Sequence, residues 1–380
     1  MSSTNTNGRL VSLDALRGFV MFWIMSGEHI IHALAKALPI PAFIWMSSQL
    51  HHTDWDGITF YDMIFPIFLF VAGVSMPFSF EKKMSVSGVK TPMELPKNEK
   101  KKIYASMLKR TCILVILGFI VNGLLRFEGY DQTRFASVLG RIGVAWFFAG
   151  IIYLNFDIKK QVLWLVGILV SYYLVMKFIP VPNFGAGILT KEGSLEGYID
   201  RQFLPGRLHS KVYDPEGLLS TIPAIGTALL GMFLGTFLRA NYFSTNKKIM
   251  IMIASAIILI GIGILWSYDF PINKRLWSSS FVCYVGGFSI LFFTFFYLII
   301  DVLGYHKWAF PLLLIGSNSI LIYMASEGVV DFKHTAEFVF GGLIKFSPLI
   351  WQPVFTTLSI TFVQLLLLYF LYKRKWFLKI

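Results

Sequence analysis

Long apolar stretches separated by short polar segments run from near residue 11 almost to the end of the chain. Most are close to the roughly 20 residues that an α-helix needs to cross the hydrocarbon core of a bilayer. The pattern therefore predicts an all-α polytopic membrane protein with about ten transmembrane helices in one domain, residues 1–380. The predicted spans are 11–31, 59–80, 104–125, 135–155, 160–180, 217–240, 247–267, 276–301, 308–328 and 353–373. A further apolar segment, 334–346, fits either an eleventh, partial span or an interfacial helix.

Composition agrees with a membrane protein and argues against a water-soluble globule. Hydrophobic residues make up 56% of the chain and charged residues 14%, and the mean hydropathy is +0.65. Soluble domains are about 45–50% apolar and about 25% charged. The first apolar stretch follows a short polar leader without an obvious cleavage site, so we expect it to be retained as a helix. Cys112 and Cys283 both lie in apolar segments, which disfavours a disulfide framework or a cysteine metal site.

The net charge of +13 is distributed as membrane topology would place it, so no nucleic-acid partner is expected. An even number of spans brings the lysine-rich segments to one face, which the positive-inside rule makes cytoplasmic, together with both termini. These segments are 81–103 with its seven lysines, 159–160, 247–248, 306–307 and 373–375. The opposite, outer face then carries 32–58, 126–134, 181–216, 268–275 and 329–352. We expect the cytoplasmic lysine-rich loop 81–103 to be flexible and solvated.

Ionisable side chains inside the spans are costly, at about 2.5–3.5 kcal/mol each at a helix centre, so each needs a partner or a function. Asp14 and Arg17 lie three residues apart near the cytoplasmic side and fit either an ion pair or a role at cofactor phosphates. Arg110 lies near the same boundary, where snorkelling towards water is the favoured interpretation. Arg141 lies deeper and fits a buried ion pair and a ligand contact equally well.

Other polar residues gather towards the outer ends of the spans. Glu28 ends the first span, Asp62 begins the second, and Glu327 lies near the end of the ninth. Asp62 fits either a helix cap or a functional carboxylate. Asn318 fits hydrogen bonding between helices somewhat better than contact with a substrate. In the sixth span, Gly231 and its partner four residues later form a GxxxG pattern, which permits close helix contact.

The outer loop before the second span concentrates polar chemistry. It holds His51, His52, Asp54, Trp55 and Asp56 within six residues. Histidine is the side chain best suited to proton transfer near neutral pH, and a neighbouring carboxylate can fix its tautomer. The spacing matches no standard metal-ligand pattern, so no metal is expected. Taken alone, an adjacent histidine pair in a loop is more often simply exposed to solvent.

Six motifs occur in order along almost the whole chain. They are Ser12-Leu13-Asp14-Ala15-Leu16-Arg17-Gly18; His52-Thr53-Asp54-Trp55-Asp56-Gly57 with Asp62 and Phe65-Pro66; Val138-Leu139-Gly140-Arg141-Ile142-Gly143; Tyr213-Asp214-Pro215-Glu216-Gly217-Leu218-Leu219 with Thr221-Ile222; Asn273-Lys274-Arg275-Leu276-Trp277-Ser278; and Asn318-Ser319-Ile320-Leu321. Together they resemble the heparan-α-glucosaminide N-acetyltransferase family, membrane enzymes that move an acetyl group from cytosolic acetyl-CoA to a glucosamine amine across the bilayer.

The resemblance implies that His52, rather than His51, is catalytic and that transfer takes place at the outer face. His52 would either carry the acetyl group covalently or act as a base in a ternary complex, and both routes need a neutral imidazole. We expect Asp54, Asp56 or Asp62 to orient the imidazole ring.

The resemblance also implies sites for acetyl-CoA and for a terminal amino sugar or glycan. The loop 181–216 is expected to contribute to the acceptor site, with its carboxylates on sugar hydroxyls and a tryptophan stacked on the ring. Candidate ligands of the acetyl-CoA phosphates are Arg17, Arg110 and Arg141. Candidate acceptor ligands are Glu28, Trp55, Asp56, Asp214, Glu216, Trp277, Asn318 and Glu327.

Departures from the family leave other functions open. Glu28 stands where the family commonly has an asparagine, and it would hold a substrate ammonium or pair with His29 or Arg141. The chain lacks the large luminal N-terminal region of the lysosomal members, which favours a bacterial inner-membrane protein. The resemblance is also compatible with a homodimer. An O-acyltransferase of an envelope glycan and a proton-coupled transporter are the alternatives, since transporters also use intramembrane charges. A non-catalytic scaffold would leave the His52 loop unexplained.

Overall fold

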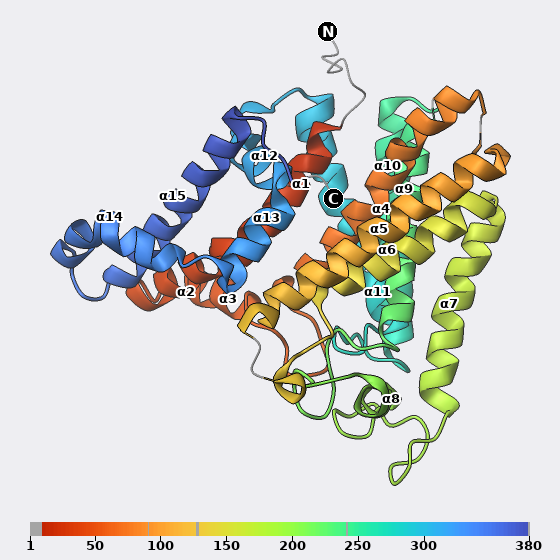
Figure 1. Ribbon diagram of the computed structural model, residues 1–380, viewed down its shortest axis with the longest axis horizontal. Helices are drawn as coiled ribbons and strands as arrows, with labels where there is room; N and C mark the ends of the chain where they lie inside the picture. The colour runs from red at the N-terminus through yellow and green to blue at the C-terminus, as the bar shows by residue number, and fades with distance from the viewer. Residues whose placement is uncertain (1–9, 90, 127–128, 241, 379–380) are drawn as a thin grey trace. The chain divides into compact units, whose positions relative to one another are not determined.

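The computed structural model describes residues 10–89, 91–126, 129–240 and 242–378, and over these residues it consists of helices, turns and isolated β-bridges (Figure 1). Nine of the described helices are long and apolar enough to cross a membrane, and a bent pair makes ten if it counts as one span. The predicted all-α polytopic fold is therefore confirmed. The nine helices are Val11–Ala37, Phe60–Ser87, Lys97–Val121, Val138–Asn155, Ile158–Phe178, Thr221–Arg239, Thr245–Ser267, Ser279–Val302 and Gln352–Lys373.

The predicted ninth span is broken. Its two helices, Lys307–Ser317 and Ser319–Val329, meet at an angle of 68° on either side of Asn318. The Asn318 side-chain amide donates to the Trp376 carbonyl at 2.9 Å, and its oxygen accepts from the Leu378 amide at 2.9 Å. Both ends of this buried side chain thus bind backbone of the C-terminal tail, which gives Asn318 a structural role, and its contact with an acceptor stays a prediction.

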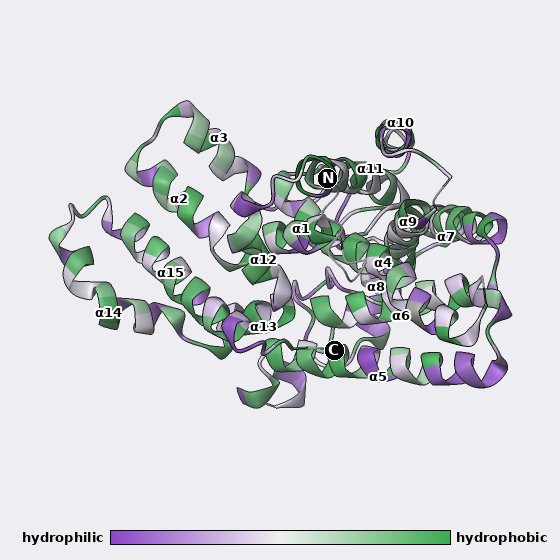
Figure 2. Ribbon diagram, turned by 90° about the horizontal axis from the view of Figure 1, so that it is seen from above, coloured by the Kyte–Doolittle hydropathy of each residue, from purple (hydrophilic) through white to green (hydrophobic). Residues whose placement is uncertain are grey.

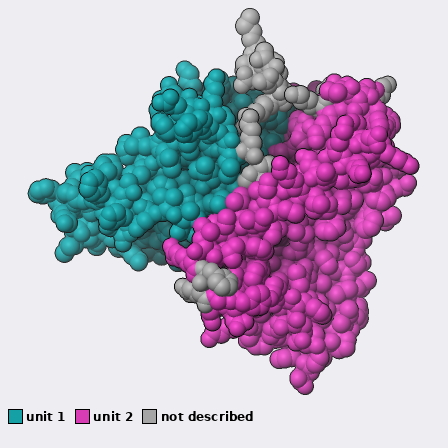
Figure 3. Space-filling model, in the orientation of Figure 1, with its two compact units in different colours: residues 1–53, 59–68, 292–379 teal, residues 54–58, 69–291, 380 magenta. Residues whose placement is uncertain are grey.

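The contacts between residues divide the chain into two compact units (Figure 3), and the single domain stays a prediction. The first comprises residues 1–53, 59–68 and 292–379, and the second comprises residues 54–58, 69–291 and 380. Helices lying wholly in the first unit are α1 Val11–Phe22, α2 Glu28–Ala37, α3 Pro41–Gln49, α12 Phe310–Ser317, α13 Ser319–Met324, α14 Phe332–Phe346 and α15 Gln352–Lys373. Those wholly in the second are α5 Lys97–Val121, α6 Val138–Asn155, α7 Ile158–Phe178, α8 Leu195–Phe203, α9 Thr221–Arg239 and α10 Thr245–Ser267. Two helices, α4 Phe60–Ser87 and α11 Ser279–Phe296, have residues in both units.

Glycines set the closest helix contacts in each unit. In the first unit, a Cβ at Gly18 of α1 would lie 1.8 Å from the Leu312 carbonyl oxygen of α12. In the second unit, a Cβ at Gly231 of α9 would lie 2.1 Å from the Phe70 carbonyl oxygen, and one at Gly235 would lie 2.4 Å from the carbonyl oxygen four residues further along α4. The GxxxG pattern of the sixth span therefore makes the close contact that it predicted.

The lysine-rich segment is mostly helical. Helix α4 continues to Ser87, and α5 begins at Lys97 with its hydrophilic turns before it becomes apolar (Figure 2). The connection between them is thus much shorter than the predicted flexible loop 81–103, and of its lysines, Lys90 lies outside the described residues. The physical reason is that hydropathy marks where a helix leaves the bilayer, whereas the helix itself continues into water.

Candidate functional site

His52 in the first unit forms a hydrogen-bonded pair with Asp62. His52 follows α3, and Asp62 is the third residue of α4. The His52 Nδ1 lies 2.7 Å from the Asp62 Oδ1. The imidazole side chain is 36% exposed, whereas the carboxylate is only 1% exposed. A buried carboxylate thus holds a histidine that substrates can reach.

Two threonines fix the other oxygen of Asp62. Its Oδ2 accepts from the amide and hydroxyl of Thr53, both at 3.2 Å. It also accepts from the amide and hydroxyl of Thr59, at 3.3 and 3.1 Å. Thr59 precedes α4 and Asp62 is three residues on, so this contact also caps the helix. The capping and functional interpretations of Asp62 are therefore compatible, and the cap fixes where Oδ1 points.

This arrangement selects one state of the imidazole. A carboxylate at Nδ1 favours the neutral tautomer that carries its proton on Nδ1, which leaves the lone pair on Nε2. The same carboxylate stabilises the cation that forms when Nε2 takes up a proton. The Tyr61 ring lies tilted against the imidazole, with ring centroids 4.8 Å apart, and limits its rotation. His52 is thus positioned as a base or nucleophile.

The neighbouring His51 has a different environment. Its ring stacks on His32, with centroids 4.2 Å apart. His32 in turn lies 3.5 Å from the Glu28 carboxylate and 2.7 Å from the Ser47 hydroxyl. Only the second member of the histidine pair therefore has the Asp62 contact.

Glu28 and Glu327 flank this region of the first unit. Both carboxyl groups are near enough to Tyr61 for electrostatic interaction, and they also interact with each other. Glu28 follows the π-helical turn Trp23–Gly27, whereas Glu327 lies at a kink in Ala325–Val329, where its backbone angles are non-helical. Such turns are frequent at functional sites.

One side chain joins the two π-helical turns. The Ser26 hydroxyl donates to the Gln364 oxygen at 2.6 Å, and the Gln364 amide donates to the Ser326 hydroxyl at 3.1 Å. Gln364 is buried in α15, so it holds both turns from one helix. This bridge positions the two glutamates, and the sequence analysis missed it because Gln364 lies more than thirty residues from either serine.

In the second unit, loops that are far apart in the sequence join through hydrogen bonds. The Trp55 indole donates to the Leu189 carbonyl at 2.6 Å, and its ring contacts Tyr213 edge to face at 5.0 Å. The Asn273 side-chain amide donates to Asp56 at 3.0 Å. These contacts give Trp55 and Asp56 anchoring roles, and their contact with an acceptor stays a prediction. Asp54 is exposed.

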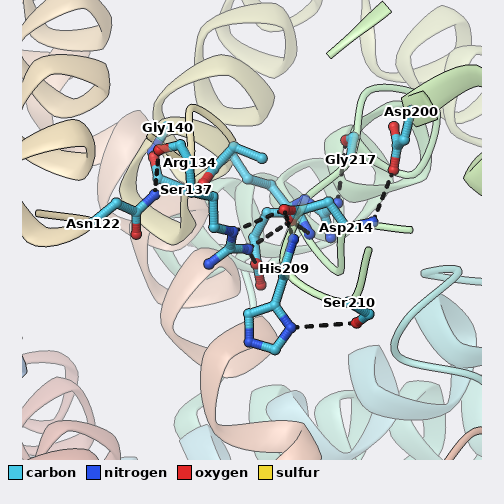
Figure 4. Close-up of polar contacts among 12 residues, drawn as sticks. Asn122, Arg134, Ser137, Gly140, Asp200, His209, Ser210, Asp214 and Gly217 are labelled. Atoms are coloured by element: carbon cyan, nitrogen blue, oxygen red, sulfur yellow. Dashed lines mark hydrogen bonds and ion pairs between the residues drawn. The ribbon is translucent and has the colours of Figure 1, made fainter. Parts of the chain in front are cut away.

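Arg134 binds Asp214 and Glu216, the two carboxylates at the end of the predicted acceptor loop, and Figure 4 shows its contact with Asp214. Its Nε and Nη2 donate to the two oxygens of Asp214 at 2.8 and 2.6 Å, and Nη2 also contacts Glu216. Burial alone would raise the pKa of Asp214, but the hydrogen bonds and charge of Arg134 hold it below its usual value. Asp214 is fully buried, so the structure gives it a clear stabilising role, and sugar binding stays a prediction. The sequence analysis missed Arg134, because an arginine in an outer loop carries no sign of its partner.

Two further carboxyl groups, Glu196 and Asp200, are fully buried in α8. Burial raises the pKa of Asp200 to about 6, although the amides of Leu218 and Asp214 donate to it. Burial, together with the neighbouring Asp200 charge, raises the pKa of Glu196 well above its usual value. Their four-residue spacing, which places both on one helix face, is the only signal that could have revealed them.

Arg141 is enclosed by the same network. It donates to the Ser220 hydroxyl and to the Gly217 carbonyl, and its guanidinium lies 5.0 Å from the Trp277 ring centroid. Trp277 is only 1% exposed and also packs edge to face on Phe281. Because Trp277 is covered in this way, the structure gives it a packing role, and the stacking of a sugar ring on it stays a prediction.

The other predicted phosphate ligands lie in separate places. Arg17 pairs with Asp14 at 3.1 Å and keeps 23% of its side chain exposed. Arg110 lies over the Trp146 ring, 4.4 Å from its centroid. Neither contact prevents the arginine from binding an anion, and the phosphate role of each stays a prediction. Among the described residues, no group of three or more His, Cys, Asp or Glu side chains is placed to hold a metal ion.

Comparisons with known proteins agree with the motifs. A family model described as a domain of unknown function, DUF5009, matches residues 9–98. The chain is 29% identical over 386 aligned positions to the heparan-alpha-glucosaminide N-acetyltransferase of Mus musculus, covering 87% of this chain and 56% of that protein. For the Homo sapiens protein of the same name the identity is 28%, covering 87% of this chain and 55% of that protein. The chain thus spans about half the length of these curated relatives. These matches support membership of the heparan-alpha-glucosaminide N-acetyltransferase family, as the six motifs predicted.

Proposed function

We propose that this chain is a transmembrane acetyltransferase that moves an acetyl group from cytosolic acetyl-CoA to the amine of a glucosamine-type sugar on the outer side of the membrane. The observation that carries the proposal is the His52–Asp62 pair, in which a buried, capped carboxylate holds an exposed imidazole. The similarity to two N-acetyltransferases over 87% of the chain supports the reaction type.

His52 would supply the base that acetyl transfer to an amine needs. A sugar ammonium must lose a proton before its nitrogen can attack the thioester carbonyl. In a ternary complex, Nε2 accepts that proton, the C–N bond forms, the C–S bond breaks, and the thiolate leaves and is protonated. In the covalent route, Nε2 attacks the thioester first and the amine then takes the acetyl group from the imidazole. Asp62 stabilises the positively charged imidazole in both routes.

Arg17 and Arg110 are stronger candidates for the donor phosphates than Arg141, which is fully buried and bound to Ser220. Arg17 keeps 23% of its side chain exposed beside Asp14. Arg110 follows Lys109 near the middle of α5, beyond the lysines of its first turns. Arg110→Ala should therefore raise the KM for acetyl-CoA, whereas Arg110→Lys should restore part of the affinity.

Glu28 and Glu327 are the strongest candidates for the acceptor ammonium. Both carboxyl groups interact electrostatically with Tyr61, the residue whose ring contacts His52. A carboxylate binds the protonated amine, whereas the asparagine common in the family at the Glu28 position offers only an amide. Glu28→Gln should raise the KM for an amino sugar more than it lowers kcat.

The direct test is to incubate purified protein with isotopically labelled acetyl-CoA and a panel of amino sugars and to analyse products by mass spectrometry. We expect label on the amine, and none with His52→Ala, which should still fold. Label on a hydroxyl would instead identify an O-acyltransferase. Turnover by His52→Ala, or no acetylated product from any acceptor including envelope glycans, would overturn the proposal.

We also propose that both termini face the cytoplasm of a bacterial inner membrane and that residues 50–57 face the periplasm. The lysine distribution supports this orientation. Single cysteines placed at Ser2 and at His51 in a cysteine-free background can be labelled in intact cells. A membrane-impermeant maleimide should label only the second, and the opposite result would reverse the orientation.

A further inference from the structure

Helices α14 and α15 form a hairpin in the first unit with a groove along it. Phe340 of α14 and Phe362 of α15 pack edge to face, 5.8 Å apart. The groove has a volume of about 660 Å³ and is lined along α14 by Lys333, Glu337 and Gly341, among others. Its other wall is formed by the first two turns of α15 and the residues before them.

The groove has a mixed lining of charged, polar and aliphatic side chains, and its surroundings are apolar. Lys345, Gln352 and Thr356 line it, whereas Phe338 and Phe346 on the same hairpin are 86% and 93% exposed. Helix α14 has 15 residues, about 22 Å, which is too short to cross a hydrocarbon core of about 30 Å. In a membrane protein, a short helix with large exposed aromatic side chains and lysines lies at the interface, where acyl chains meet headgroups.

The net charge of the side chains that line the groove is opposite and equal to that of one phosphodiester. Lys333 lies 3.8 Å from Glu337, so these two charges offset each other. Lys345, at the other end of α14, has no ion-pair partner among the described residues. Two lysines and one glutamate leave a net charge of +1, which is the complement of a single phosphodiester.

The remaining polar groups favour a headgroup that carries hydroxyls. The Gln352 amide donates to the Ser347 carbonyl at 3.3 Å, and the Thr356 hydroxyl donates to the Gln352 carbonyl at 2.8 Å. The Thr356 hydroxyl proton and one of the two N–H groups of Gln352 are thus used within the protein, whereas both side-chain oxygens can still accept. A hydroxylated headgroup supplies the donors that these oxygens need.

We propose that this groove binds an anionic glycerophospholipid with a hydroxylated headgroup, such as phosphatidylglycerol. The phosphate lies at Lys345, the headgroup hydroxyls face Gln352 and Thr356, and the acyl chains lie over the exposed aromatic side chains of the hairpin. The site is independent of the proposed acetyl transfer.

Two adjacent glycines provide a matched test. A Cβ at either Gly341 or Gly342 would meet nothing within 4 Å, and both lie inside α14, but only Gly341 lines the groove. Leucine at either position therefore raises helix propensity equally, whereas only Gly341→Leu fills the groove. The protein is purified into mixed micelles with equal amounts of phosphatidylglycerol and phosphatidylcholine, and retained lipid is counted by native mass spectrometry.

We expect wild type and Gly342→Leu to retain phosphatidylglycerol preferentially and Gly341→Leu to retain both lipids equally. Lys345→Gln should lower the affinity for phosphatidylglycerol about fivefold, the contribution of one lysine at an anionic surface, whereas Lys345→Arg should keep it. If Gly341→Leu does not fold, the comparison of Lys345→Gln with Lys345→Arg tests the proposal instead. Equal retention of the two lipids by wild type, or equal retention by both leucine variants, would overturn the proposal. So would loss of a dimer in Gly341→Leu with unchanged lipid retention, which would identify a second copy of the chain as the occupant.

Discussion

Replacing Asp62 with asparagine should abolish acetyl transfer by changing the histidine tautomer. The Asp62 Oδ2 accepts from two backbone amides, those of Thr53 and Thr59, at 3.2 and 3.3 Å. These donors cannot reverse, so an asparagine must place its oxygen towards them and its NH2 group towards His52. The imidazole Nδ1 would then accept a hydrogen bond, and the proton would move to Nε2, where it blocks proton uptake.

The size of the effect follows from this geometry. A wrong tautomer at a catalytic imidazole lowers kcat by about ten-thousandfold when the rest of the site is intact. We therefore expect Asp62→Asn to reduce the rate by a factor between about a hundred and about ten thousand. The assay is formation of acetylated amino sugar from labelled acetyl-CoA by purified protein, with thermal unfolding measured in parallel. The melting temperature should change little, because the asparagine oxygen still accepts both amides.

Thr59→Val is the matched control. It removes the Thr59 hydroxyl, which lies 3.1 Å from Asp62 and donates to the His51 carbonyl at 2.7 Å, but keeps the backbone amide and the His52 contact. We expect it to cost about 0.5–2 kcal/mol of stability, as for a lost helix cap, and to leave the rate within about tenfold of wild type. A folded Asp62→Asn protein whose rate also stays within tenfold of wild type would refute the tautomer argument.

Four further outcomes are expected. His51→Ala should leave the transfer rate within about threefold of wild type in the same assay, because the His51 ring stacks on another imidazole and not on the reactive pair. Gly231→Leu should destabilise the protein by about 1–3 kcal/mol or more in thermal unfolding, because its Cβ would lie 2.1 Å from a carbonyl oxygen, whereas Gly261→Leu, which enters open space, should not. Arg134→Met should cost about 3–5 kcal/mol, because it leaves the buried Asp214 without its cation, and Asp214→Asn in that background should recover part of the loss. Since the pKa of Asp214 is lowered in the fold, its stabilising contribution is present above the ordinary aspartate pKa and is lost as pH falls below about 4, so wild type should lose stability there more steeply than Asp214→Asn.

The spans could be predicted because their length and hydropathy are properties of the sequence alone. The bend in the ninth span could not, because it depends on contacts of Asn318 with the tail near residue 376, far away along the chain. The His52–Asp62 pair was within reach, since both residues flank one loop and the start of one helix. Arg134 and Glu196 were not, because nothing local to a polar loop residue shows that it becomes buried.

The sequence pattern alone also could not decide whether His51 or His52 has the contact with Asp62. Both are imidazoles in one loop, and periodicity gives no reason to prefer either. The reason lies in the backbone of α4, which begins at Phe60 and places Asp62 in its first turn, where the cap points one carboxylate oxygen back along the loop. The motif resemblance identified the residue, and the helix start supplies its physical basis.

Contacts within each unit also bear on the number of spans. In the second unit, segments 54–58, 126–134, 181–216 and 268–275 join through Trp55, Arg134 and Asn273. Segments that touch outside the bilayer must be separated by an even number of crossings, and two candidate spans lie between each successive pair. In the first unit, the amides of Val11 and Ser12 donate to Asp301 at 3.2 Å, and eight candidate spans lie between the two ends of that contact. These counts make no use of charge and are consistent with an even number of crossings between the joined segments, and the assignment of the loops to two faces stays a prediction. Only the assignment of the cytoplasmic face depends on the lysines. If a labelling experiment placed the lysine-rich face outside, the proposed direction of acetyl transfer would reverse, but the contacts among the loops would stay the same.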